Sequence, residues 1–66
     1  MRYKIEADAG DGNWIELVRG EGNLDDARAK ARELAARAHN RDVQGWRISE
    51  FADASFTERV QTHTAP

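Results

Sequence analysis

RYKIEADAGDGNWIELVR, residues 2–19, is the stretch that decides the fold. Polar and apolar side chains alternate over residues 2–8 and again over 14–19, which is typical of strands that bury one face. The segment between the two runs, AGDGN, favours a turn, because glycine, aspartate and asparagine tolerate the backbone angles that turns require. The sequence therefore predicts an antiparallel β-hairpin.

The register of this hairpin follows from the side chains that would face each other. We expect Ile5 opposite Ile15, because this register pairs apolar residues on one face and sets Lys4 opposite Glu16 on the other. A shift by one residue would move every apolar side chain to the wrong face.

A helix is predicted after the hairpin, over residues 24–39. Asn23 suits the N-cap position, and no glycine, proline or β-branched residue interrupts the segment. Asn40 can supply a left-handed residue at the C-terminal end. One stripe of the helix is apolar and mostly alanine, which allows a close approach to a sheet. This stripe comprises Leu24, Ala27, Ala31, Leu34, Ala35 and Ala38.

A third strand is predicted over residues 43–51. Its apolar residues, Val43, Trp46, Ile48 and Phe51, do not all fall on one face of a regular strand, because two have odd and two have even residue numbers. A β-bulge at Gly45 would bring Val43 and Trp46 to the same face. Alternation resumes over residues 55–61, so a fourth strand at the sheet edge is possible there.

These elements predict an α+β fold of the type ββαβ, or ββαββ if the fourth strand forms. One amphipathic helix would pack on one face of a small, mainly antiparallel sheet of three or four strands. We expect a single domain over residues 1–60 and a frayed tail over 61–66. The predicted core comprises Tyr3, Ile5, Ile15, Leu17, Leu24, Leu34, Val43, Trp46 and Ile48.

Composition argues against several classes of function. Ten basic and twelve acidic residues give a net charge of −2, there is no cysteine, and there are only two histidines. No run of residues is apolar enough to cross a membrane, and no signal peptide opens the chain. We therefore expect a cytoplasmic, non-enzymatic protein with no catalytic residues, no cofactor, no metal and no small-molecule substrate.

Two glycine-rich segments repeat one pattern, GDGNW at residues 10–14 and GEGNL at residues 20–24. The second precedes a helix N-terminus, where backbone amides can hold a phosphate. Neither segment completes a phosphate-binding motif, and Glu21 would repel an anion. We interpret both segments as turns.

The sheet face that the single helix leaves uncovered is the predicted interface. An aromatic and a β-branched side chain among charges are typical of an interface anchor. The candidate interface residues are Trp14, Val18, Arg2, Lys4, Glu16 and Arg47. We expect a protein partner there, either a host protein or a second copy of the chain, bound through this face or through an edge strand. Trp14 could instead fold over the sheet edge onto arginines of its own chain, or the tail could cover it. A third interpretation of this face is a platform of an aromatic ring and arginine for stacking nucleic-acid bases.

The alternative function is nucleic-acid binding through arginines of the helix, Arg28, Arg32 and Arg37, together with Arg47. Acidic residues lie between these arginines, and a net charge of −2 gives little attraction for phosphates. The composition therefore disfavours this alternative without removing it.

The segments LDDARAKARELA, residues 24–35, and VQGWRISE, residues 43–50, resemble those of many short orphan proteins of actinobacteria and their phages. Arginine outnumbers lysine eight to two, which is typical of a GC-rich genome. The resemblance covers about residues 2–51 and rests on fold signals. It implies a small accessory protein, such as one carried by a phage, and no catalytic residue.

Overall fold

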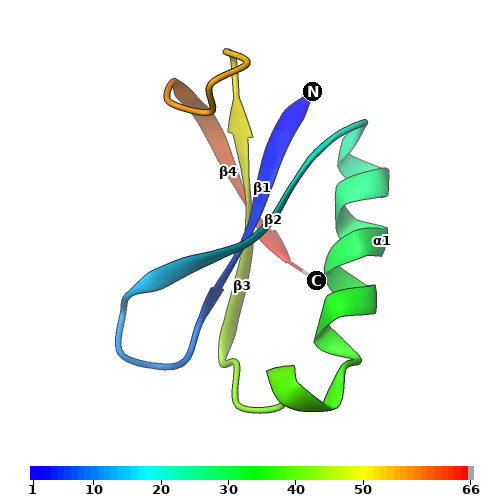
Figure 1. Ribbon diagram of the computed structural model, residues 1–66, viewed down its shortest axis with the longest axis vertical. Helices are drawn as coiled ribbons and strands as arrows, with labels where there is room; N and C mark the ends of the chain where they lie inside the picture. The colour runs from blue at the N-terminus through cyan, green and yellow to red at the C-terminus, as the bar shows by residue number, and fades with distance from the viewer. Residues whose placement is uncertain (66) are drawn as a thin grey trace.

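Four antiparallel strands and one helix make up the architecture (Figure 1). The computed structural model describes residues 1–65. The strand order is β2-β1-β3-β4, and α1 packs against one face of this sheet. The arrangement confirms the predicted α+β class and the ββαββ order of elements. The elements are β1 (Arg2–Asp8), β2 (Trp14–Glu21), α1 (Leu24–Ala35), a 3₁₀ turn (Ala38–Asn40), β3 (Gly45–Phe51) and β4 (Arg59–Ala65).

The hairpin of β1 and β2 forms, but its predicted register is wrong. Asp8 lies opposite Trp14, because the Asp8 carboxylate accepts hydrogen bonds from the N–H groups of Gly10 (2.8 Å) and Gly12 (3.1 Å) and thereby holds a wider loop. Both glycines have positive φ angles, 111° and 83°. The turn therefore fixes a register that hydropathy alone does not show.

A β-bulge then shifts the pairing of β1 with β2. Glu6 lies opposite Glu16 while its neighbour Ile5 lies opposite Val18, so Leu17 is the extra residue on β2. The bulge lies in the middle of β2. Residues on each side of it still alternate between the two sheet faces, but the two halves of β2 pair with β1 in registers that differ by one residue.

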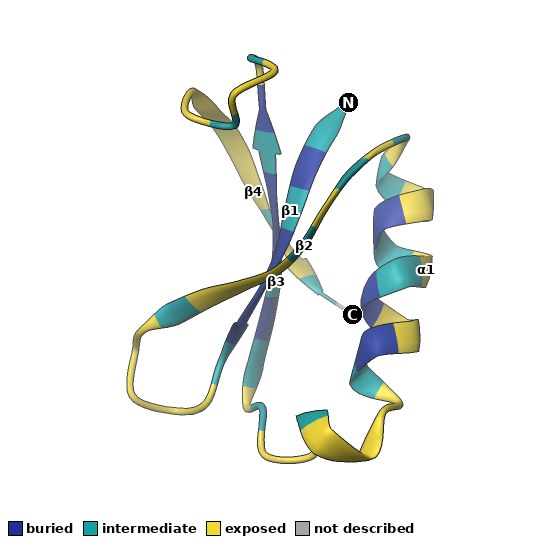
Figure 2. Ribbon diagram, viewed as in Figure 1, coloured by how far each residue is buried: buried dark blue, intermediate teal, exposed yellow. Residues whose placement is uncertain are grey.

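The core lies between α1 and the middle of the sheet. Ile5 and Ile48 face each other on β1 and β3, and both are fully buried. Alanines of α1 allow the helix to approach these two strands closely, and Figure 2 shows its buried stripe turned toward the sheet. The core cluster comprises Tyr3, Ile5, Ala7, Ala27, Ala31, Leu34, Trp46 and Ile48.

Two predicted core residues, Ile15 and Leu17, are outside this cluster. Their exposed fractions are 60% and 39%. α1 packs against β1 and β3, so β2 lies at the sheet edge beyond the cover of the helix. Leu24 and Val43 are only partly buried, against the rim of the core.

No bulge forms at Gly45, contrary to the prediction. β3 begins at Gly45 and pairs with β1 without a shift in register. Val43 lies in the preceding loop, so strand alternation does not apply to it. A side chain at position 45 would instead meet Trp14, since a Cβ built there lies 3.1 Å from the Cη2 atom of that ring.

The ends of α1 are set by two asparagines. Asn23 forms a capping box with Asp26: the Asn23 side chain accepts from the Asp26 N–H at 2.8 Å, and the Asp26 carboxylate accepts from the Asn23 N–H at 3.0 Å. The helix ends at Ala35, four residues before the predicted end. Asn40 caps it through its side chain, which donates to the Leu34 carbonyl at 2.7 Å, and not through a left-handed backbone.

The fourth strand forms, and it includes most of the predicted tail. β4 covers Arg59–Ala65, so residues 61–65 are paired with β3 and the prediction that they fray is wrong. Backbone hydrogen bonds to β3 hold this segment although it has few apolar side chains. Pro66, which also belonged to the predicted tail, lies outside the described residues.

Candidate functional site

The sheet face opposite α1, called the open face here, carries most of the predicted interface. The strand register places on it Arg2, Lys4, Glu6, Asp8, Trp14, Glu16, Arg19, Glu21, Gly45, Arg47, Ser49, Phe51, Arg59, Thr62 and Thr64. Val18 is the exception among the predicted residues. It lies opposite Ile5 and packs against the core on the α1 side. The bulge at Leu17 explains this difference.

Glu6 lies at the centre of a polar cluster on the open face. Its carboxylate accepts hydrogen bonds from Arg47 Nε at 3.1 Å, from Arg59 Nη1 at 3.2 Å and from the Ser49 hydroxyl, which also accepts from Arg59. Burial alone would raise the pKa of Glu6, but the hydrogen bonds from Ser49, Arg47 and Arg59 outweigh it and hold the pKa below its ordinary value. The buried carboxylate is therefore ionised, and its Oε1 atom accepts three hydrogen bonds.

Trp14 contacts a cation of its own chain. The Arg47 guanidinium carbon lies 4.4 Å from the centroid of the Trp14 ring, within cation–π range. Trp14 is half-buried and extends toward Gly45, whose missing side chain leaves room for the ring. Among the alternatives that the sequence left open for Trp14, the structure has the ring folded onto an arginine of its own chain.

Two phenylalanines, neither of them predicted as part of a site, form the other end of the open face. Phe51 is buried, and its ring centroid lies 5.8 Å from that of Phe56. Lys4 and Arg59 approach the Phe51 ring at 4.9 and 5.2 Å, and Arg19 approaches the Phe56 ring at 5.0 Å. Phe51 has an odd residue number, whereas Trp46 and Ile48 have even ones. Alternation along the strand therefore places Phe51 on the opposite sheet face from those two residues, and this is the sequence signal for its position on the open face.

The loop between β3 and β4 places Phe56 over this end of the sheet. Asp53 organises the loop: its carboxylate accepts from the N–H groups of Thr57 (2.9 Å) and Glu58 (2.8 Å) and from the Thr57 hydroxyl. These hydrogen bonds lower the pKa of Asp53 to about 2. Phe56 has a positive φ of 56°, unusual for a residue with a side chain, and the closed loop holds it there.

An ion-pair chain links this end to β2. Glu16 contacts Lys4 Nζ at 3.3 Å and Arg19 Nε at 2.7 Å. The Lys4–Glu16 pair was predicted, and it forms diagonally across the strands because Lys4 lies opposite Arg19. The rings of Trp14, Phe51 and Phe56 and the carboxylates of Glu6 and Glu16 are thus already partnered by cations of the same chain.

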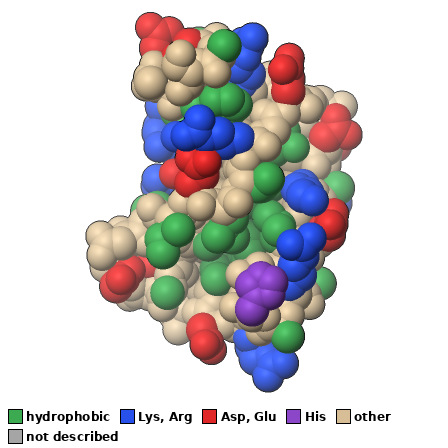
Figure 3. All heavy atoms as spheres, viewed as in Figure 1, with side chains coloured by type: hydrophobic (Ala, Val, Ile, Leu, Met, Phe, Trp, Pro, Cys, Tyr) green, Lys and Arg blue, Asp and Glu red, His purple; other side chains and the backbone are tan. Residues whose placement is uncertain are grey.

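The outer edge of β2 offers a different surface, called the β2 edge here and defined by Ile15, Leu17 and Val18. β2 pairs with β1 on one side, and no strand within residues 1–65 pairs with it on the other. Ile15 and Leu17 are exposed, and Val18 is half-buried beside them. Figure 3 shows hydrophobic side chains gathered between the β1–β2 hairpin and α1. In this view β2 crosses in front of the other strands (Figure 1).

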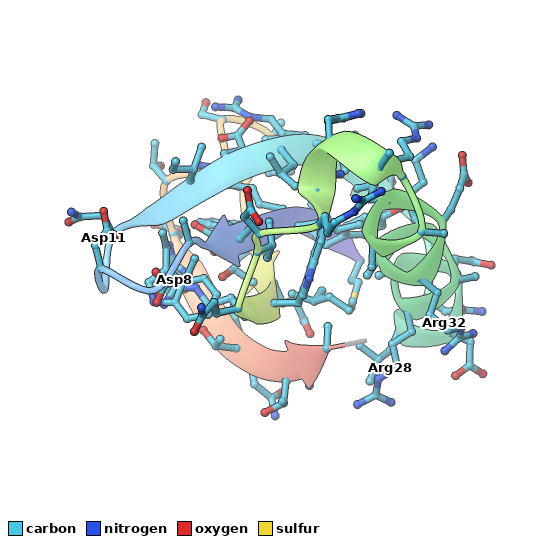
Figure 4. All side chains as sticks on the ribbon, turned by 90° about the horizontal axis from the view of Figure 1, so that it is seen from below. Asp8, Asp11, Arg28 and Arg32 are labelled. Carbon is cyan, nitrogen blue, oxygen red and sulfur yellow. The ribbon has the colours of Figure 1, made fainter. Side chains whose placement is uncertain are left out.

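The arginines of the alternative, nucleic-acid surface do not form one patch with the open face. Arg28 and Arg32 project from α1, on the opposite side of the sheet from Arg47 (Figure 4). Arg37 follows the helix and pairs with Glu33 at 3.3 Å, and Glu33 also contacts Lys30 at 3.3 Å. Acidic residues therefore interrupt the basic surface of α1.

Residues 1–65 contain no pocket and no group of three or more His, Cys, Asp or Glu side chains placed to hold a metal ion. Asp8 and Asp11, at the hairpin loop in Figure 4, bind backbone N–H groups of that loop. No helix in the described part of the chain is both long and apolar enough to cross a membrane.

The fold and surfaces define a small α+β protein, with one helix on an open four-stranded antiparallel sheet. No family model, curated protein or solved structure matches the chain.

Proposed function

We propose that this chain is a small, non-enzymatic protein-binding module whose recognition element is the β2 edge. The observation that carries the proposal is the exposure of Ile15 and Leu17 on an edge strand with a free outer side. An extended segment of another protein can add to such an edge, since main-chain hydrogen bonds supply affinity and the exposed side chains supply specificity.

Burial of these side chains gives the expected driving force. Full burial of an isoleucine or leucine side chain contributes about 1.5–3 kcal/mol. The open face supplies less, because Trp14 and Phe51 already contact Arg47 and Lys4. We therefore place the binding function on the edge strand and not on the face around Trp14. The setting we propose is the cytoplasm, in an accessory protein of the kind that the resemblance to phage proteins implies.

The test compares substitutions on the two edge strands. Val60 on β4 is exposed to 59%, almost as much as Ile15, and so provides a matched control. Ile15→Lys should abolish capture of the partner by a tagged chain, whereas Val60→Lys should leave it unchanged. Equal capture by both variants would contradict a role for the β2 edge.

Nucleic-acid binding is the second candidate, and the arginines stacked on aromatic rings of the open face favour it. Five cations lie on that face, with four carboxylates among them, those of Glu6, Asp8, Glu16 and Glu21. The cations are Arg2, Lys4, Arg19, Arg47 and Arg59. Arginine stacked on an aromatic ring can also receive a base. Binding that falls steeply with salt would support this candidate over the first.

A further inference from the structure

We infer that the occupant of the β2 edge is a second copy of this chain, paired antiparallel with β2 about a two-fold axis that passes between Leu17 and Val18. This inference rests on the proposed function and names its partner. The two copies would then form one continuous sheet of eight strands, with the two β2 strands at its centre.

The register follows from the position of the axis. Leu17 lies opposite Val18 of the second copy, and Glu16 lies opposite Arg19 of the second copy. Further from the axis, Ile15 lies opposite Gly20 of the second copy. A two-fold axis repeats each of these pairs, so one contact patch serves both copies.

The β-bulge at Leu17 is what permits this register. In a regular strand, Glu16 and Arg19 point to opposite faces, because they are three residues apart. Here both lie on the open face, since Glu16 lies opposite Glu6 and Arg19 lies opposite Lys4 in the strand register, and Glu6 and Lys4 are both on that face. Residues that oppose each other across two antiparallel strands share a face. The bulge therefore lets Glu16 meet Arg19 of the second copy on the same side of the joint sheet.

The charges in this register are complementary. Glu16 meets Arg19 of the second copy twice, once on each side of the axis, and no like charges oppose each other among these pairs. Both side chains can reach the partner, as 34% of the Glu16 side chain and 49% of the Arg19 side chain is exposed. Within one chain Glu16 and Arg19 already contact each other at 2.7 Å, so pairing across the axis exchanges two contacts within the chains for two contacts between them.

The apolar residues also meet in this register. Ile15 and Val18 share the α1 side of the sheet with Ala7 and Ile5, and α1 does not cover β2. Ile15 would come to rest against Gly20 of the second copy, which presents no side chain. On the other edge strand, β4, Val60 is the exposed large apolar residue, and residues 61–64 are polar. The observations thus favour β2 over β4 as the strand that pairs.

Disulfide trapping tests the register, and the natural absence of cysteine makes a single introduced thiol unambiguous. Leu17→Cys places the two Cα atoms one residue out of direct opposition, about 6 Å apart, which a disulfide can span. Ile15→Cys is the matched control, since its two copies lie five residues apart along the strands, about 16 Å. We expect Leu17→Cys to form covalent dimers about tenfold faster than Ile15→Cys under mild oxidation, because pairing raises the effective thiol concentration.

A charge exchange provides the second arm. Glu16→Arg and Arg19→Glu should each weaken the homodimer in sedimentation, because each places like charges across the axis. Mixing the two variants should restore a dimer, since every pair across the axis is then complementary, whereas the pair within each chain stays broken. Circular dichroism of each variant checks that it is folded.

Two results would overturn the inference: equal rates of trapping for the two cysteine variants, or a wild-type chain that sediments as a monomer at the highest concentrations tested. If Ile15→Lys nevertheless abolishes capture of a different protein, the β2 edge binds that protein and only the second-copy inference fails. If Ile15→Lys changes nothing, the proposed function fails as well.

Discussion

Glu6 of β1 and Arg47 of β3 lie opposite each other on the open face, with 3.1 Å between Glu6 Oε1 and Arg47 Nε. The same Oε1 atom also accepts hydrogen bonds from Arg59 and Ser49. One buried carboxylate on β1 thereby ties β3 and β4 to the middle of the sheet.

Glu6→Ala should destabilise the fold by about 1–3 kcal/mol, because it leaves the buried Ser49 hydroxyl and the partly exposed guanidinium groups of Arg47 and Arg59 without this carboxylate. Urea denaturation at neutral pH measures this loss. Glu33→Ala is the control, since Glu33 pairs with Lys30 and Arg37 at the surface and its loss should cost at most about 1 kcal/mol. Similar losses for the two variants would show that the Glu6 cluster contributes no more than a surface pair.

Gly20→Ala should destabilise the chain by about 1–3 kcal/mol through overpacking. Gly20 lies opposite Tyr3, and a Cβ at position 20 would come within 2.5 Å of the Tyr3 hydroxyl oxygen and 2.6 Å of Cζ. Because Tyr3 is buried, its ring has little room to move. Thermal unfolding of Gly20→Ala, Tyr3→Leu and the double variant tests this. The double variant should lose less than the sum of the single losses, and strict additivity would contradict the contact.

Stability should fall as the pH drops below about 4. The pKa of Glu6 is lower than its ordinary value of 4.5, and that of Asp53 is lowered from 3.8 to about 2. A carboxyl with a lowered pKa binds fewer protons in the folded chain. Its contribution is present above the unfolded-state pKa and disappears as the pH falls through the folded-state value.

Asp53→Asn isolates one part of this acid dependence. The variant should be less stable than wild type at pH 7 and should approach it at pH 2, where the wild-type carboxyl becomes protonated. Free energies of unfolding from urea titrations at pH 7, 4 and 2 give the comparison. A constant difference between the two chains at all three pH values would show that the loop does not depend on the charge of Asp53.

The sequence predicts β1, β2 and the start of α1 because each has a local signal. Alternation marks β1 and β2, and Asn23 marks the start of α1. The predicted end of α1 fails because its helical pattern continues beyond Ala35, whereas the Asn40 side chain caps the helix at the Leu34 carbonyl. β4 is mispredicted for the opposite reason, since backbone pairing with β3 holds a segment whose side chains carry little hydropathy signal.

The candidate site is less predictable than the fold, because it depends on register. A single residue, Leu17, shifts Val18 from the open face to the α1 side, and such a bulge leaves no pattern in composition. The exposure of Ile15 depends on which strands α1 covers, which is a tertiary property. The cations that cover Trp14 and Phe51 come from different strands, and only the sheet order brings them to those rings.

Nucleic-acid binding has a direct test. If the β2 edge is the functional surface, single-stranded RNA and DNA should show no mobility shift with this chain even at low salt. If a shift appears and weakens steeply as salt rises, phosphate contacts are responsible. Arg28→Glu with Arg32→Glu then tests α1, and Arg59→Glu tests the open face. A shift that only the Arg59 variant removes would assign binding to the open face.

Trp14→Ala separates the open face from the β2 edge. The loss of the ring removes its cation–π contact with Arg47 and part of the cover over Gly45, so we expect a destabilisation of about 1–2 kcal/mol. The helix signal in circular dichroism should stay unchanged, since α1 packs on the other face of the sheet. Trapping of the Leu17→Cys dimer should also proceed at about the same rate in the Trp14→Ala background, because Trp14 is the terminal residue of β2, three residues from Leu17, and its ring contacts Arg47 of its own chain. A loss of trapping in a folded Trp14→Ala chain would place the interface on the open face instead, where the aromatic ring would then contact the partner directly.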